Sequence, residues 1–137
     1  MPAKKSDKFY IRSSYTDTSE SQYGIYVYYR LDTGEIIYVG KDSNIRQHRR
    51  HLDHIAPSKR TEQNINRYLQ TEGMSEVIGY SVLAIYASEA EMNIAEVMYI
   101  MFYKALGQAK MNISVDITPA AYEAIVKGIG KLDLEVK

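Results

Sequence analysis

Segments rich in aromatic and β-branched residues predict three β-strands in the chain. Residues 23–30 (YGIYVYYR) and 35–39 (EIIYV) both have this composition, which favours strands. The four residues between them have the composition of a turn, in which Gly34 can adopt a positive φ without steric cost. These two strands are therefore expected to pair as an antiparallel hairpin. Residues 76–87 (EVIGYSVLAIYA) predict the third strand.

Apolar residues at helical spacing predict four helices. The first covers about residues 44–56, until Pro57 ends it. The second covers about residues 61–72 and ends at a glycine. The third covers residues 88–106 and begins at a capping box, in which a serine is followed three residues later by a glutamate. Residues 118–127 predict the last helix, with proline at its first position.

This order of elements predicts an α/β (α+β) protein with a small three-stranded antiparallel sheet flanked by helices, in the order ββααβα plus a C-terminal helix. Residues 1–22 are polar and lack a clear period, so a flexible N-terminal extension is expected there. Residues 23–130 contain no internal linker and are expected to form one domain. Residues 131–137 would be a C-terminal tail.

The composition of the chain limits the kinds of metal site and of cellular location that are expected. The chain has no cysteine, which excludes disulfides and thiolate metal sites, so a metal would need oxygen or nitrogen ligands. No apolar run is long enough to cross a bilayer and no secretory signal is visible, so a cytoplasmic protein without a membrane partner is expected. Formal net charge is zero, yet residues 41–67 contain seven basic and three acidic residues together with all three histidines. That segment could face phosphates or could simply be a solvated helix surface.

Three side chains stand out as candidates for chemistry. Tyr26 and Tyr38 lie on the two paired strands, where both hydroxyls can reach one face of the sheet. Glu96 lies on the apolar stripe of the long helix, among residues that are normally buried. A carboxylate in that position needs a partner or access to water, and a divalent cation is one such partner.

These residues resemble the signature of the GIY-YIG nuclease family. Residues 24–26 (GIY) are followed, after eleven residues, by residues 38–40 (YVG). The resemblance continues through the start of the first helix and through the second helix. It also includes Glu96 after the third strand and Asn112 after the long helix, and it covers about residues 23–113.

The resemblance implies a DNA endonuclease that hydrolyses phosphodiester bonds with one Mg²⁺ or Mn²⁺ ion. By this resemblance Tyr26 would be the general base for a water, directly or through a neighbour. Tyr38 would orient that water or help to deprotonate it, and Glu96 would bind the metal. Lys41 and Asn112 would contact the substrate or support the site, and an arginine would hold the phosphate. A tyrosine is a poor base near neutral pH, and the charges of the metal and the arginine are expected to lower its pKa.

The first helix departs from the family pattern at the arginine. Counting from Ile45 places His48 where the arginine belongs. A shifted register brings His51 to the following position of the pattern, and a third register pairs Arg50 with His54 at the right spacing. Taking Ile45, Leu52 and Ile55 as the inward stripe, the expectation is that His48 faces the two tyrosines. The candidate phosphate ligands are Arg46, Arg49 and Arg50.

Three functions are compatible with these residues. The first is an active nuclease of the compact type found in phage, mobile-element or restriction enzymes. The second is a DNA- or protein-binding regulatory module that keeps the fold without turnover, and the third is a purely structural module. One active site nicks one strand, so a double-strand break would require a homodimer or two sequential nicks.

Overall fold

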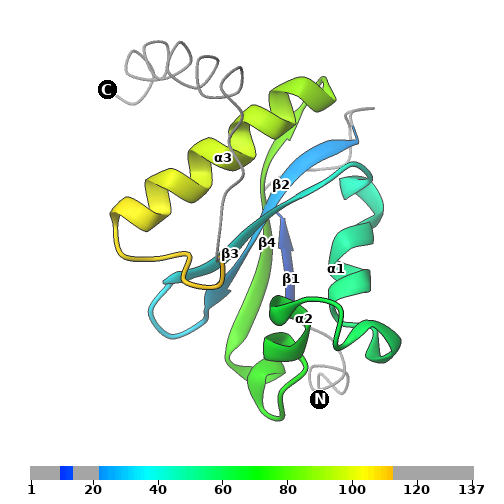
Figure 1. Ribbon diagram of the computed structural model, residues 1–137, viewed down its shortest axis with the longest axis vertical. Helices are drawn as coiled ribbons and strands as arrows, with labels where there is room; N and C mark the ends of the chain where they lie inside the picture. Colours follow the sequence, from blue (N-terminus) through cyan, green and yellow to red (C-terminus); the bar gives the residue numbers. More distant parts are fainter. Residues whose placement is uncertain (1–9, 14–21, 113–137) are drawn as a thin grey trace.

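The structure is a computed structural model that describes residues 10–13 and 22–112 (Figure 1). Four strands of these residues form one sheet, in the spatial order β1-β4-β2-β3. The strands are β1 (Tyr10–Ser13), β2 (Tyr23–Arg30), β3 (Ile36–Asp42) and β4 (Ile78–Tyr86). The α-helices are α1 (Arg49–His54), α2 (Asn64–Leu69) and α3 (Glu89–Ala105), and the short 3₁₀ helices are η1 (Ile45–Gln47), η2 (Pro57–Lys59) and η3 (Met74–Glu76).

The hairpin predicted for the first two strands of the pattern is confirmed by β2 and β3. They pair antiparallel, with Tyr26 opposite Gly40, and Gly34 in their turn has φ +79°. The other edge of β2 pairs antiparallel with β4. Three antiparallel strands flanked by helices, in the predicted order, confirm the α+β class within residues 22–112.

Strand β1 corrects the prediction that residues 1–22 are only a flexible extension. It pairs parallel with β4, from Tyr10 opposite Gly79 to Ser13 opposite Val82, so the sheet has four strands where the pattern predicted three. A four-residue strand is too short to show a period, and its pairing depends on an edge that a distant part of the sequence supplies. The helix predicted at 118–127 and the tail at 131–137 lie outside the described residues.

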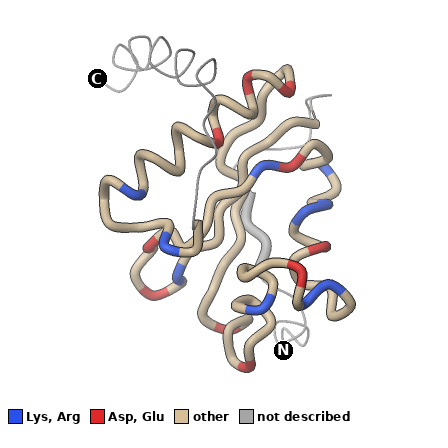
Figure 2. Tube along the Cα trace, in the orientation of Figure 1, with Lys and Arg blue, Asp and Glu red and all other residues tan. Residues whose placement is uncertain are grey.

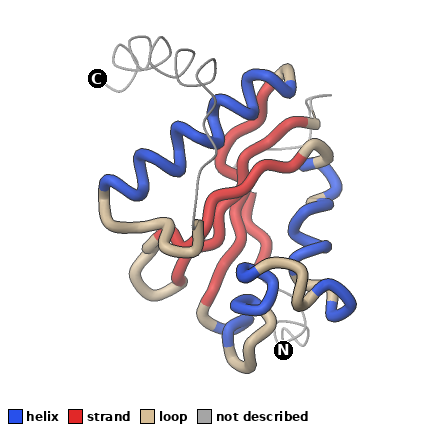
Figure 3. The backbone as a smooth tube through the Cα atoms, viewed as in Figure 1, coloured by secondary structure: helices blue, strands red, loops and turns tan. Residues whose placement is uncertain are grey.

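Helices cover both faces of the sheet (Figures 1 and 3). Helix α3 packs on one face, against Ile25 and Val27 of β2, and α1 and α2 pack on the other, against Tyr26 and Tyr28. Successive side chains of a strand point to opposite faces, so β2 contributes to both cores. The excess of tyrosine therefore has a largely structural origin, because several tyrosines form the core beneath α1 and α2.

The first predicted helix is broken at His48. This residue has φ +53° and ψ +42°, a left-handed conformation that separates η1 from α1. The break shifts the helical phase, so the predicted inward stripe is wrong at Leu52, whereas Ile45 is buried and Ile55 packs against the core as predicted. Leu52 is 52% exposed, whereas His51 and His54 are buried against the sheet.

Helix α3 begins as the capping box predicted. The Ser88 hydroxyl accepts a hydrogen bond from the backbone N–H of Glu91 at 3.2 Å. Met92, Ala95 and Ile100 are its buried residues, so the helix presents one apolar face to the sheet. Within residues 10–13 and 22–112, no helix combines the length and the apolar character needed to span a bilayer.

Candidate functional site

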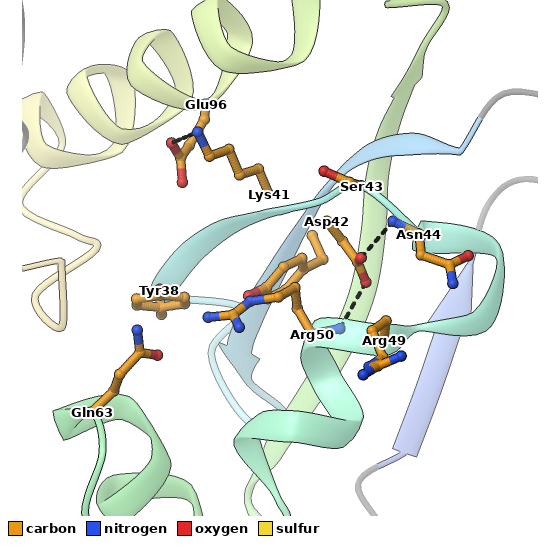
Figure 4. Close-up of a pocket in the computed structure, with 10 residues that line it drawn as sticks. Tyr38, Lys41, Asp42, Ser43, Asn44, Arg49, Arg50, Gln63 and Glu96 are labelled. Carbon is orange, nitrogen blue, oxygen red and sulfur yellow. Dashed lines mark hydrogen bonds and ion pairs between the residues drawn. The ribbon is translucent and has the colours of Figure 1, made fainter. Parts of the chain in front are cut away.

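A pocket of about 460 Å³ opens beside the edge strand β3 (Figure 4). Figure 4 shows Glu96 reaching toward it from α3 on one side of β3, with Arg50 of α1 and Gln63 on the other side. Because β3 is an edge strand, side chains from both helical layers can reach this place. The lining residues are Tyr26, Tyr38, Lys41, Asp42, Ser43, Asn44, Arg49, Arg50, Gln63 and Glu96.

Two glycines allow close packing of residues around β2 and β3. A Cβ on Gly40 would lie 2.3 Å from both Cζ and Oη of Tyr26, so the tyrosine ring can lie across β3 only where Gly40 has no side chain. A Cβ on Gly24 would lie 2.6 Å from Cγ1 of Ile45, the first residue of η1. The two glycines of the sequence signature therefore have steric roles: Gly40 admits the Tyr26 ring, and Gly24 lets η1 approach β2.

Tyr26 is hydrogen-bonded to His54, which the sequence pattern offered only in the third of three registers. The Tyr26 Oη lies 2.7 Å from Nε2 of His54, at the end of α1. The other ring nitrogen of His54 lies 2.6 Å from Oδ1 of Asn66 on α2. All three side chains are buried. They form a continuous chain of polar contacts that leads from the pocket into the core.

Burial dominates the acid–base character of the two pocket tyrosines. It raises the pKa of Tyr26 well above 10, and the neighbouring Tyr38 raises it further, whereas the charge of Arg50 lowers it. Burial also raises the pKa of Tyr38, followed in importance by the charge of Glu96. The charge of Arg50 acts on the Tyr26 pKa in the expected direction, but the effect of burial is larger. Tyr26 is a neutral phenol at pH 7 and can take a proton only if it gives its own to another group.

Arg50 is one of the candidate phosphate ligands that line the pocket. Asp42, which is 2% exposed, accepts hydrogen bonds from the backbone N–H of Asn44 at 2.7 Å and of Arg50 at 2.9 Å. These bonds fix the first turn of α1, and the Arg50 side chain lines the pocket. Arg49 also lines the pocket, but Arg46 does not.

Glu96 is the carboxylate best placed to hold a cation. Its side chain is 22% exposed, and the ammonium of Lys41 lies 3.9 Å from its Oε1. Lys41 also donates a hydrogen bond to Oδ1 of Asn93 at 2.8 Å. Burial raises the pKa of Glu96, while Lys41 and Arg50 lower it.

The donor set fits a weakly ligated Mg²⁺ ion. Among the described residues, no three histidine or acidic side chains gather closely enough to hold a metal by themselves. Mg²⁺ commonly uses one or two carboxylates and completes its shell with waters and substrate phosphates. The Glu96 carboxylate beside an open pocket meets that requirement, with the substrate supplying further oxygens.

The three histidines occupy different environments. The expectation that His48 faces Tyr26 and Tyr38 is wrong, because its Nδ1 pairs with the Tyr80 hydroxyl at 2.9 Å. His51 pairs through Nδ1 with the Tyr28 hydroxyl at 2.8 Å and does not line the pocket. His54 meets Tyr26, so the pairing of Arg50 with His54 is the register that the structure brings to the site.

Asn112 supports the edge strand rather than the pocket wall. Its Oδ1 accepts a hydrogen bond from the N–H of Val39, and its Nδ2 donates one to the carbonyl of Val39, both at 2.9 Å. The residue is buried and does not line the pocket, so the predicted substrate contact is wrong while the supporting role agrees with the geometry. Its two bonds hold the segment of β3 that follows Tyr38.

Three basic residues of the segment 41–67 line the pocket, namely Lys41, Arg49 and Arg50. In Figure 2 the Lys and Arg positions of the segment 41–67 lie along the end of β3 and the layer of α1 and α2, with a few acidic positions among them. Acidic positions mark the first turn of α3, at Glu89 and Glu91. A zero net charge therefore conceals an uneven distribution.

Comparisons of the chain with protein-family models, with curated proteins and with solved structures found no match. The fold and the site are thus defined by their own geometry. They describe an α+β protein whose edge strand carries a polar pocket lined by two tyrosines, two arginines and two carboxylates.

Proposed function

We propose that the protein is a metal-dependent DNA endonuclease of the GIY-YIG type, which hydrolyses phosphodiester bonds. The observation that carries this proposal is that Tyr26, Tyr38 and Glu96, from two strands and a distant helix, line one pocket. Arg50 joins them there from a third region of the chain. This convergence of residues from distant parts of the chain supports the proposal.

Charged groups on opposite walls would hold the scissile phosphate. Glu96 would bind Mg²⁺ or Mn²⁺, which supplies neutralisation of the charge that develops on the phosphate and its leaving oxygen. Arg50 would hold two phosphate oxygens through its planar guanidinium. Lys41 would turn from Glu96 toward a phosphate oxygen once a divalent cation occupies the carboxylate.

Proton transfer would run through Tyr26 to His54. As the attacking water forms its bond to phosphorus and the P–O bond of the leaving group breaks, one water proton passes to Tyr26 Oη. The original hydroxyl proton of Tyr26 passes to Nε2 of His54, 2.7 Å away. Burial lowers the pKa of His54, against the opposing effect of its hydrogen bond to Asn66, so the imidazole is neutral at pH 7 and has one ring nitrogen free to accept a proton. Tyr38 would orient the water from the other strand.

A second candidate function is a DNA-binding module without turnover. Glu96 is the residue of α3 that lines the pocket, and the ammonium of Lys41 lies beside its carboxylate. A permanent Lys41–Glu96 ion pair would therefore exclude a divalent cation. Such a protein would bind DNA in a salt-sensitive manner and leave it intact.

Plasmid nicking tests these two functions. Purified protein is incubated with supercoiled plasmid and Mg²⁺ or Mn²⁺, and the nicked form is measured over time. Wild-type protein is expected to nick DNA, Glu96→Gln to abolish nicking, and Glu89→Gln, an exposed change on the same helix, to leave it unaffected. Intact plasmid under both metals, with DNA retained in a gel-shift assay, would replace the nuclease by the binding module.

A further inference from the structure

Asn66 is a buried amide whose orientation is determined by its two partners. Its Nδ2 donates a hydrogen bond to the backbone carbonyl of Lys59 at 2.8 Å. A carbonyl oxygen can only accept, so the amide nitrogen must face Lys59 and the amide oxygen must face His54. The residue is 3% exposed, so solvent offers no alternative partner.

The orientation of Asn66 determines which nitrogen of His54 carries the proton. Oδ1 of Asn66 can only accept, so Nδ1 of His54, 2.6 Å away, must donate. A neutral imidazole protonated at Nδ1 has its lone pair on Nε2. That lone pair meets the Tyr26 hydroxyl, which therefore donates to it. Every bond of the chain runs in one direction, from Tyr26 to the carbonyl of Lys59.

We infer that Asn66 is a positioning residue that holds His54 in the tautomer able to accept the Tyr26 proton. The inference rests on the proposed nuclease function, which it deepens. In the opposite tautomer, Nε2–H would donate to Tyr26 Oη and could not receive a proton from it. A third group that orients an imidazole in this manner is a general device of proton-transfer sites. Asn66 supplies the orientation without adding a negative charge.

Gln70 provides a matched control on the same helical segment. Its Nε2 donates hydrogen bonds to the backbone carbonyls of His54 at 2.9 Å and Ala56 at 3.0 Å. Gln70→Ala therefore loosens the same end of α1 without removing a partner of the imidazole. Asn66→Ala removes the partner of the imidazole, and Asn66→Asp keeps an acceptor for Nδ1–H while it loses the donor to Lys59.

Nitrogen-15 NMR of the histidine side chains, recorded at neutral pH without DNA, tests the tautomer directly. Wild-type protein is expected to show His54 protonated at Nδ1 and bare at Nε2. Asn66→Asp and Gln70→Ala are expected to keep this tautomer, and Asn66→Ala to lose it or to mix the two forms. A wild-type His54 protonated at Nε2, or an unchanged tautomer in Asn66→Ala, would overturn the inference.

Nicking rates connect the tautomer to catalysis. Asn66→Ala is expected to slow nicking about 10- to 100-fold, as loss of an orienting partner commonly does. Gln70→Ala is expected to remain near the wild-type rate. Asn66→Asp is expected to recover most of the rate and to move the acid limb of the pH–rate profile to higher pH, because a carboxylate stabilises the imidazolium. Equal losses in Asn66→Asp and Asn66→Ala would assign Asn66 a merely structural role at Lys59. If wild-type protein fails to nick, the proposed function fails, while the NMR result still decides the tautomer.

Discussion

Two tyrosine–histidine pairs on the same strand and helix have similar geometry and different surroundings. Tyr26 meets His54 at 2.7 Å, and Tyr28 meets His51 at 2.8 Å. Tyr26 lines the pocket, whereas neither member of the second pair does, and the His51 ring stacks on Tyr80 at a centroid distance of 4.2 Å. A buried tyrosine–histidine hydrogen bond therefore does not by itself distinguish the two pairs. What distinguishes the first pair is its access to the pocket and its continuation to Asn66.

Removing each tyrosine hydroxyl is expected to give the largest difference between the pairs. Tyr26→Phe should lower the nicking rate by roughly 10²- to 10⁴-fold, the range for loss of a general acid–base group. Tyr28→Phe should leave the rate within a few-fold of wild type. It should instead destabilise the fold by about 1–3 kcal/mol, because it leaves the buried Nδ1 of His51 without this partner.

Single-turnover nicking and urea unfolding of both variants measure these effects. Similar unfolding free energies in the two variants, together with a large loss of nicking in Tyr26→Phe alone, would support the distinction between the two pairs. A Tyr28→Phe protein that folds normally and yet loses nicking as severely as Tyr26→Phe would remove it.

Two glycines allow the same steric change to be made inside and outside the site. A Cβ on Gly40 would meet the Tyr26 hydroxyl at 2.3 Å, and a Cβ on Gly79 would meet Cζ of Tyr29 at 2.7 Å. Gly40→Ala and Gly79→Ala are both expected to cost about 1–3 kcal/mol of stability, as overpacking usually does. Only Gly40→Ala should also reduce nicking, by about 100-fold, because a displacement of about 1 Å at a catalytic group has an effect of that size. Similar nicking by the two variants, compared at equal folded fraction, would show that the position of Tyr26 is not critical.

Acid is expected to unfold the protein largely through protonation of His51, in the second tyrosine–histidine pair. Burial lowers the pKa of His51 to about 3, with the charges of His48 and His54 as further causes, against an unfolded value of about 6.5. Its folded-state pKa is depressed, so the unfolded chain binds the proton first, and stability falls as pH decreases from about 6.5 toward 3. By pH 5 this single group should cost about 2 kcal/mol.

Urea unfolding at pH 7 and pH 5 measures this loss. His51→Gln should reduce the difference between the two pH values. His48→Gln should reduce it less, because His48 is only half-buried and its pKa is less affected. An identical pH dependence in wild type and His51→Gln would show that His51 does not titrate as described.

The parts of the fold that depend on local pattern were predictable from the sequence. The hairpin follows from the composition of β2 and β3 and from Gly34, and the start of α3 follows from Ser88 and Glu91. The positions of Tyr26, Tyr38 and Glu96 around one pocket depend only on pairing these elements correctly. Local sequence patterns were therefore sufficient to predict the elements that position these three residues.

Other features depended on contacts that no local pattern reveals. The left-handed conformation of His48 shifts the phase of α1, and this shift brings Arg50 and His54 to the site instead of His48. The Arg50–His54 spacing was a usable signal, although it stood among competing registers. Asn66 gave no signal, because its role arises only when α2 packs against α1.

The smallest expected effect tests this shifted phase directly. Leu52 lies between the two paired histidines on α1 and is 52% exposed, so Leu52→Gln should change stability by no more than about 0.5 kcal/mol and leave nicking intact. Leu69 on α2 is 1% exposed, and the same change there should cost well over about 2 kcal/mol. Urea unfolding compares the two variants. A loss of stability in Leu52→Gln as large as that in Leu69→Gln would instead indicate an uninterrupted helix with Leu52 facing inward. In that helix His51 and His54 would point away from the sheet and could not contact the two tyrosines.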